Sequence, residues 1–136
     1  MSQRSRDLLV VSNNPLAISI LSPHFRVEPL ESQSFRDVLL FVRDHIHKGH
    51  RLLTHPLSGS IKPNETPYKS IVISRKPDGF SPEDLEMIET AIITFDKFPH
   101  DDTPLSDKIH QDFQLVDYTL VAGGLDFDPV AGLQQL

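Results

Sequence analysis

Two short apolar segments constrain the fold of this chain more than any other feature of its sequence. The first is LLVV, residues 8–11, and the second lies within YKSIVIS, residues 68–74. The first segment does not alternate apolar with polar residues, as expected of a strand that is buried on both faces. The second is rich in β-branched residues, which favour strands. Because a strand covered on both faces needs helices on both sides of its sheet, the sequence predicts a layered α/β fold.

Two helices are predicted in the first half of the chain from their capping residues. Asn14 as N-cap and Pro15 as first helical residue begin a short helix over residues 16–21, since the missing N–H of proline is not needed there. Ser34 caps the clearest helix of the sequence. That helix ends at Lys48-Gly49, where a cation meets the negative end of the helix dipole and glycine can take the left-handed conformation.

Two more helices are predicted in the second half. One begins at Ser81-Pro82 and the other at Thr103-Pro104. We expect each to bury one apolar stripe. The stripes are Leu85, Ile88, Ile92 and Phe95 in the first helix, and Leu105, Ile109, Phe113, Val116 and Leu120 in the second.

The remaining elements complete the predicted topology. Residues 25–30 and 51–54 predict two further strands, the former interrupted by Pro29. The order of elements predicts a small, mainly parallel sheet of about four strands with helices on both faces, a Rossmann-like layering that ends in two C-terminal helices. We expect a single domain over residues 1–124 and a C-terminal tail, residues 125–136, that is partly extended or frayed.

Charge and composition exclude several classes of function. Residues 43–76 hold seven basic and two acidic side chains, whereas residues 77–136 hold two basic and thirteen acidic ones. The acidic part argues against nucleic-acid binding, while the cationic middle is compatible with a small anionic ligand. The absence of cysteine excludes disulfides, thiolate metal sites and cysteine nucleophiles. Without a signal-peptide pattern or an apolar run of membrane-spanning length, we expect a cytoplasmic protein that is not bound to a membrane.

One long connection is the most conspicuous candidate for function. Residues 55–67, between two predicted strands, form a thirteen-residue loop with three prolines and one glycine, and connections of that length are usually functional or disordered. In layered α/β sheets, ligands bind beyond the carboxyl ends of strands. If the strands at 8–11 and 51–54 are neighbours, Asn13-Asn14 and this loop reach the same edge of the sheet.

The loop is similar in kind to an anion cradle, although it lacks the spacing of a P-loop. The candidate ligand contacts are Asn13, Asn14, His55, Ser58, Gly59, Ser60, Lys62, Asn64 and Lys69. In this hypothesis the two serines and the glycine donate hydrogen bonds, the two lysines supply charge, and His55 and Asn64 orient the ligand. Purely structural roles stay open: the serines in turns, Asn14 as a helix cap, and His55 bonded to loop carbonyls.

Metal and nucleophile signatures are absent from the sequence. His45 and His47 lie two residues apart, about 200° around a helix, so they do not form a metal-binding pair, and we expect no metal and no cofactor. No Gly-x-Ser-x-Gly motif is present. His55 is the candidate general acid or base, since histidine titrates near neutral pH. Glu83, Glu86 and Glu89 are expected on a solvated helix face.

The segment RDHIHKGHRLLTHPLSGSIKPNETPYKSIVIS, residues 43–74, resembles the GrdX family, small proteins encoded beside glycine reductase genes in amino-acid-fermenting anaerobes. SNNP at 12–15 and the helix after residue 81 fit the same pattern, so the resemblance covers residues 7–98. It implies an accessory part in glycine, sarcosine or betaine reductase metabolism, with components of that system as expected partners, and it assigns no catalytic residues. A chain without cysteine cannot itself carry out the thiol and selenol steps of such a system.

Three functional hypotheses follow. The leading one is an accessory protein that binds a small anion, such as a carboxylate or phosphate ester, at the strand carboxyl ends. The second is a hydrolase or transferase that acts on an acyl or phosphoryl group with His55 as general acid or base. The third is a protein-interaction subunit whose acidic C-terminal half makes the contact. A homo-oligomer is expected if an apolar helix face remains uncovered.

Overall fold

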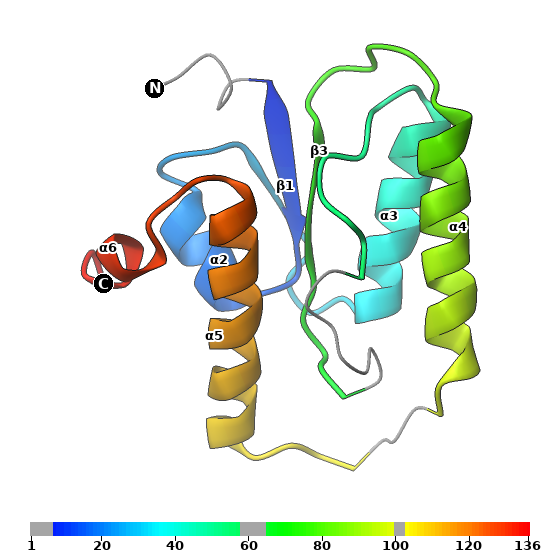
Figure 1. Ribbon diagram of the computed structural model, residues 1–136. Coiled ribbons are helices and arrows are strands. Elements are labelled where there is room, and N and C mark those ends of the chain that lie inside the picture. Colours follow the sequence, from blue (N-terminus) through cyan, green and yellow to red (C-terminus); the bar gives the residue numbers. More distant parts are fainter. Residues whose placement is uncertain (1–6, 58–64, 100–102) are drawn as a thin grey trace.

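The chain folds into three layers, with one sheet between two layers of helices (Figure 1). The computed structural model describes residues 7–57, 65–99 and 103–136. One face of the sheet is covered by α2 (Pro15–Leu21), α5 (Asp107–Gly124) and α6 (Pro129–Leu133), and the other by α3 (Phe35–His47) and α4 (Pro82–Lys97). The predicted α/β class with helices on both faces is therefore confirmed.

The sheet differs from the prediction in strand number and direction. Its three strands are β1 (Leu8–Ser12), β2 (Val27–Pro29) and β3 (Ser70–Ser74), in the order β2-β1-β3. β1 pairs in parallel with β2 and antiparallel with β3. The sheet of the described residues is thus mixed and three-stranded, and the expectation of about four mainly parallel strands is not confirmed. β3 takes the place beside β1 that the prediction gave to residues 51–54.

Residues 51–54 keep part of a backbone ladder with β3, since the N–H of Leu53 donates to the Val72 carbonyl and the N–H of Ser74 to the Arg51 carbonyl. Side chains interrupt that ladder on both sides, because Thr54 Oγ1 accepts the N–H of Val72. Asp84 Oδ2 accepts the N–H of Leu52 at 2.9 Å, and Ser74 Oγ accepts the N–H of Arg51 at 2.7 Å. A single bridge, from Leu52 to Ile73, joins this segment to β3 rather than to β1. Both β1 and this segment are antiparallel to β3, so both run in the same direction and reach the same edge of the sheet.

The strands send alternate side chains to two separate core clusters. Val11, Ile71 and Ile73 pack against α3 and α4, whereas Val10 and Val72 pack against α2 and α5. This alternation follows from the two-residue period of a strand. It explains why both apolar segments lack a polar face.

The apolar stripe predicted for the last long helix is not the face that α5 buries. Val116 is 54% exposed, and Ile109 and Leu120 are also exposed, while Tyr118, on the opposite face, is fully buried. The full buried set of α5 is Asp117, Tyr118, Val121 and Ala122. The helix contains two apolar rows, and packing against α2 and β3 selects the row with fewer large aliphatic residues.

The C-terminal tail forms a short helix, which corrects the expectation of an extended or frayed segment. Asp128 Oδ1 caps α6 by accepting the N–H groups of Val130 and Ala131. The Tyr118 hydroxyl donates to the carbonyl of Pro129 at 2.8 Å and holds α6 against α5. Gly132 is buried in this contact.

Gly132→Ala is expected to destabilise the fold by about 1–3 kcal/mol, as overpacking does in other cores. A Cβ at this position would overlap the side chains of Tyr118, Ile20 and Phe127. Gly123→Ala is the matched control, because a Cβ there meets no atom within 4 Å and alanine has a higher helix propensity than glycine. Urea unfolding measures both, and equal stabilities of the two variants would contradict the tight packing of α6.

Candidate functional site

The side chain of Asn13 joins the carboxyl end of β1 to the end of the long loop. Its Nδ2 donates to the carbonyls of Gln33 at 2.9 Å and Pro67 at 2.8 Å, and its Oδ1 accepts the backbone N–H of Lys69 at 2.8 Å. Asn13 is only 4% exposed. The Asn13 amide therefore holds the start of β3 beside the end of β1, at the lower edge of the sheet in Figure 1.

Asn14 performs the predicted capping role and a second one. Its Oδ1 accepts the N–H of Leu16 at 3.0 Å, so it caps α2 as expected. Its Nδ2 donates to the carbonyl of Gln114 at 2.8 Å and to Asp117 Oδ2 at 2.9 Å. Both amide hydrogens are thus used within the protein, and Asn14 ties α2 to α5.

Asp117 is a buried carboxylate at the centre of this edge. Its Oδ1 accepts the N–H of Ser70 at 3.0 Å, and its Oδ2 accepts the Ser70 hydroxyl at 2.6 Å in addition to the Asn14 amide. Ser12 Oγ lies 2.7 Å from Ser70 Oγ and extends the network to β1. Burial raises the pKa of Asp117, against the opposing hydrogen bonds from Ser70 and Asn14 and the charge of Lys69.

Lys69 is a buried cation beside Asp117. The residue is 3% exposed, and burial lowers the pKa of its ammonium, while the charge of Asp117 acts in the opposite direction. Lys69 borders a cavity of about 170 Å³, which we call the Lys69 cavity. Its lining residues are Thr54, His55, Lys69, Ser70, Asp117, Leu120, Val121 and Gly124.

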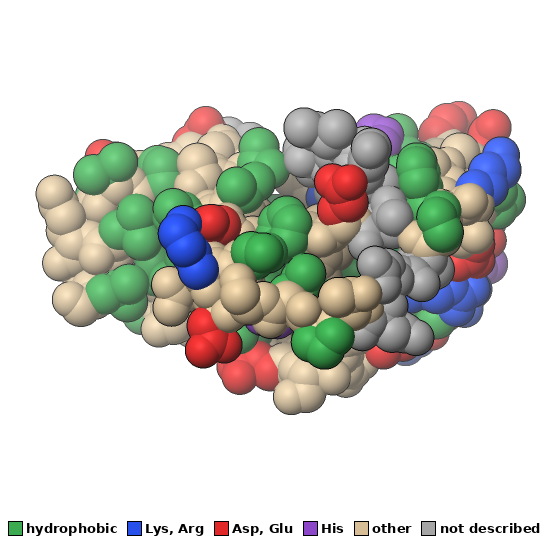
Figure 2. All heavy atoms as spheres, turned by 90° about the horizontal axis from the view of Figure 1, so that it is seen from below, with side chains coloured by type: hydrophobic (Ala, Val, Ile, Leu, Met, Phe, Trp, Pro, Cys, Tyr) green, Lys and Arg blue, Asp and Glu red, His purple; other side chains and the backbone are tan. Residues whose placement is uncertain are grey.

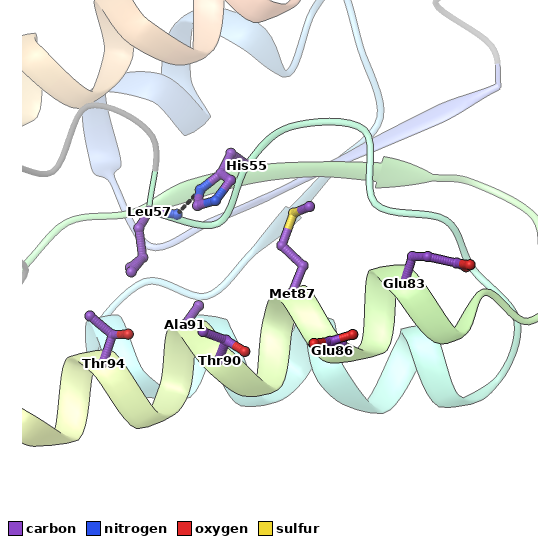
Figure 3. Close-up of a pocket in the computed structure, with 8 residues that line it drawn as sticks. All are labelled: His55, Leu57, Glu83, Glu86, Met87, Thr90, Ala91 and Thr94. Carbon is purple, nitrogen blue, oxygen red and sulfur yellow. Dashed lines mark hydrogen bonds between the residues drawn. The ribbon is translucent and has the colours of Figure 1, made fainter.

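His55 lies between the Lys69 cavity and a second, larger one. Its Nδ1 accepts the N–H of Leu57 at 3.1 Å, which in the neutral ring leaves the proton on Nε2. The second cavity is an open groove of about 410 Å³ between residues 55–57 and α4 (Figure 3). Glu83 and Glu86 also line that groove, and its described lining contains no lysine or arginine. The groove is therefore unfavourable for an anion.

Four of the predicted contact residues meet at one edge of the sheet. Asn13 and Asn14 follow β1, His55 follows the segment parallel to it, and Lys69 precedes β3. Five others lie outside the described residues: Ser58, Gly59, Ser60, Lys62 and Asn64. Figure 2 views this edge from below, and the described Lys and Arg side chains in view are scattered and do not form a patch.

Sequence reasoning missed Asp117, Ser70 and Thr54. Asp117 cannot be told apart in the sequence from the other acidic residues of the C-terminal part, thirteen in all, most of which belong to solvated helix faces. The available signal is the serine at one end of each apolar strand. Ser12 and Ser70 are partners in the strand register, and two buried hydroxyls on one face require a polar partner from the covering helix.

The histidines of the middle segment have structural partners. Nδ1 of His45 lies 2.9 Å from the carbonyl of Phe41, and Nδ1 of His50 lies 2.8 Å from the carbonyl of Ser74. Within the described ranges, no three His, Asp or Glu side chains come together in a group that could hold a metal ion. No helix among the described residues is both long and apolar enough to cross a membrane.

Comparison with known proteins identifies the family. Residues 9–126 match the family model described as GrdX-like protein. No curated protein and no solved structure shows a significant match to the chain. The matched range includes β2, β3, all of β1 except Leu8, the helices α2 to α5 and every candidate site residue. The chain belongs to the GrdX-like family.

Proposed function

We propose that this protein binds a small anion, with a carboxylate as the leading chemistry, in the Lys69 cavity, and that it serves as an accessory protein in glycine, sarcosine or betaine reductase metabolism. Membership of the GrdX-like family supports the metabolic context. The observation that carries the binding proposal is Lys69, a nearly fully buried cation on the wall of a cavity. Buried charges are retained where a partner or a ligand compensates them.

The cavity offers further donors to a carboxylate. The Thr54 hydroxyl accepts the N–H of Val72 and keeps its own proton for donation, and His55 presents its Nε2–H. The Asp117 carboxylate is occupied by three donors from Ser70 and Asn14, which compensate much of its negative charge. An anion in the cavity therefore meets an ammonium and two neutral donors, beside the hydrogen-bonded carboxylate of Asp117.

The size of the cavity limits the ligand. About 170 Å³ corresponds to the volume of roughly five or six water molecules. Drug-sized ligands occupy pockets of about 300–1,000 Å³. The part of the site that the described residues enclose therefore suits a small carboxylic acid or inorganic phosphate rather than a nucleotide.

The loop residues remain part of the proposal as additional contacts. Ser58, Gly59, Ser60, Lys62 and Asn64 are proposed to donate hydrogen bonds and charge from the loop. Asn13 supports this proposal, because it binds Pro67 and Lys69 at the loop's end and so holds that end beside the cavity. We assign Asn13 and Asn14 a positioning role, since their amide hydrogens are already donated to protein acceptors.

The geometry supports the two other hypotheses less well. As a general base, His55 needs a free ring nitrogen at the substrate, whereas the Leu57 N–H donates to Nδ1, so the neutral ring offers a hydrogen-bond donor at Nε2 and no base there. An acidic docking surface needs its carboxylates on one face. The acidic residues of α4 and α5 lie on opposite sides of the sheet, so they do not form a single surface.

The binding proposal predicts thermal stabilisation by small anions at low ionic strength. At a ligand concentration of 100 Kd, the free energy of unfolding should rise by about 2.7 kcal/mol. We expect acetate or phosphate to raise the melting temperature of the wild type and of Lys97→Met, an exposed control on α4. Lys69→Met should abolish the shift, and Ser60→Ala and Lys62→Ala should reduce it. A wild-type protein that no anion stabilises, or an undiminished shift in Lys69→Met, would refute the proposal.

A further inference from the structure

The Lys69 cavity combines a buried amine with titratable and proton-donating groups. Lys69, Asp117 and His55 all line this space of about 170 Å³, together with the apolar side chains of Leu120 and Val121. Anion binding needs the charge of Lys69 but does not need the rest of this set. A desolvated amine beside a carboxyl group and an imidazole that donates a hydrogen bond is typical of sites in which lysine acts as a nucleophile.

We infer that Lys69 is a nucleophilic lysine that condenses reversibly with the carbonyl group of a small aldehyde or 2-oxo acid to form an imine. For oxo acids the inference deepens the proposed function and rests on it, since the same cavity must admit the carboxylate. For neutral aldehydes it stands independently. The substrate class is set by the volume of the cavity, which suits molecules with a few non-hydrogen atoms.

The chemical step balances without an oxidant or reductant. The lone pair of the Lys69 Nζ attacks the carbonyl carbon and forms the C–N bond, while the carbonyl oxygen takes up a proton. The nitrogen then loses a proton, the hydroxyl group accepts a second proton, and the C–O bond breaks to release water. One neutral amine, one carbonyl compound and one net proton thus give one protonated imine and one water molecule, and loss of that proton from the nitrogen gives the neutral imine.

The neighbours of Lys69 suit both stages of this step. Only the neutral amine is nucleophilic, and burial of Lys69 disfavours its charged form. The Nε2–H of His55, on the same cavity wall, donates a hydrogen bond to the carbonyl oxygen as negative charge develops on it, while water supplies the protons. The imine is cationic when protonated, and the Asp117 carboxylate, fixed by Ser70 and Asn14, stabilises a positive charge there.

A purely structural lysine makes the opposite prediction for chemical labelling. Lys69 is 3% exposed, whereas the side chain of Lys108 is 83% exposed and Lys97 is also exposed. A buried lysine without special reactivity reacts more slowly than exposed lysines with any reagent. If a buried lysine is labelled faster than exposed ones, the cause is the binding of the reagent in its cavity and the lowered basicity of its amine.

The test is reductive trapping on the intact wild-type protein. The folded chain is incubated at pH 7.5 with pyruvate or with propanal and sodium cyanoborohydride, and peptide mass spectrometry measures the rate of alkylation at each lysine. We expect the initial rate at Lys69 to exceed those at Lys97 and Lys108 severalfold, because burial lowers the pKa of Lys69 and the cavity holds the carbonyl compound beside its amine. Lys69→Arg should lose this fast phase and keep the slow labelling of the exposed lysines.

The outcomes separate this inference from the proposed function. If acetate stabilises the protein through Lys69 but trapping at Lys69 is slower than at Lys97 and Lys108, the imine is refuted and anion binding stands. If propanal is trapped first at Lys69 while no anion stabilises the protein, anion binding is refuted and the nucleophilic lysine stands. The decisive comparison of labelling rates is made on the wild-type protein, so poor folding of a Lys69 variant does not affect the result.

Discussion

Asp117→Ala is expected to lower the free energy of unfolding by about 3–5 kcal/mol, the range measured when a buried ionic partner is removed. The substitution leaves three buried donors without an acceptor, namely the N–H and the hydroxyl of Ser70 and the amide of Asn14. Each such group destabilises the folded state by about 1–3 kcal/mol when it stays unsatisfied. It also removes a carboxylate whose charge favours the ammonium form of Lys69.

Asp112→Ala on the same helix is the matched control for this prediction. Asp112 forms an exposed pair with Lys108 at 3.3 Å, with 62% of its side chain exposed. Surface changes of this kind stay within about 0.5 kcal/mol. Urea denaturation of both variants measures the difference. If Asp117→Ala falls within 1 kcal/mol of Asp112→Ala, as an order-of-magnitude limit, Asp117 does not hold α5 to the sheet.

Asn13→Ala is expected to destabilise the protein by about 2–4 kcal/mol, since it deprives two carbonyls and one N–H of their buried partner. It should also weaken anion binding, because the backbone of Pro67 and Lys69 loses its attachment to the end of β1. The effect on binding is measured by titration under conditions in which the variant is folded.

Gln33→Ala is the control for Asn13, because Gln33 contacts Asn13 through its main-chain carbonyl only and its side chain is exposed. Its stability and anion affinity should match those of the wild type. Equal effects of Asn13→Ala and Gln33→Ala would mean that the asparagine does not position the loop.

The predictable parts of this fold are those with a local physical cause. Asn14, Ser34 and Ser81 cap their helices as predicted, because a side-chain acceptor at the N-cap satisfies N–H groups only two or three residues away. The sequence also indicated which face of α4 is buried. Ile88, Ile92 and Phe95 all pack into the core as their spacing predicts.

The errors arise where distant residues decide the outcome. Residues 51–54 have the composition of a strand, but they lie beside β3, where the Ser74 and Thr54 hydroxyls accept two N–H groups that a full ladder would pair with carbonyls. On α5, the choice between two apolar rows depends on α2 and β3, and the burial of Asp117 depends on Ser70 and Asn14, far away in the sequence. Local periodicity contains none of this information.

The candidate site shows the same division. The sequence predicted that Asn13, Asn14 and the loop after His55 meet at one edge, and the described ends of the loop do lie there. The strands at 8–11 and 51–54 are not neighbours as expected, because β3 lies between them. The edge is shared because both segments run in the same direction. Asp117 reaches it from α5, through a tertiary contact with no sequence motif.

The most direct test is NMR of the lysine side-chain amines, labelled with ¹³C and ¹⁵N, while acetate is added at constant ionic strength. We predict that the signals of Lys69 and of Lys62, the second proposed contact, shift and saturate, and that the pKa of Lys69 rises in the complex, since a bound carboxylate favours the charged ammonium. Lys97 and Lys108 should not respond. A Lys69 signal that stays unchanged, or that moves in parallel with those of the exposed lysines, would contradict a ligand site in this cavity.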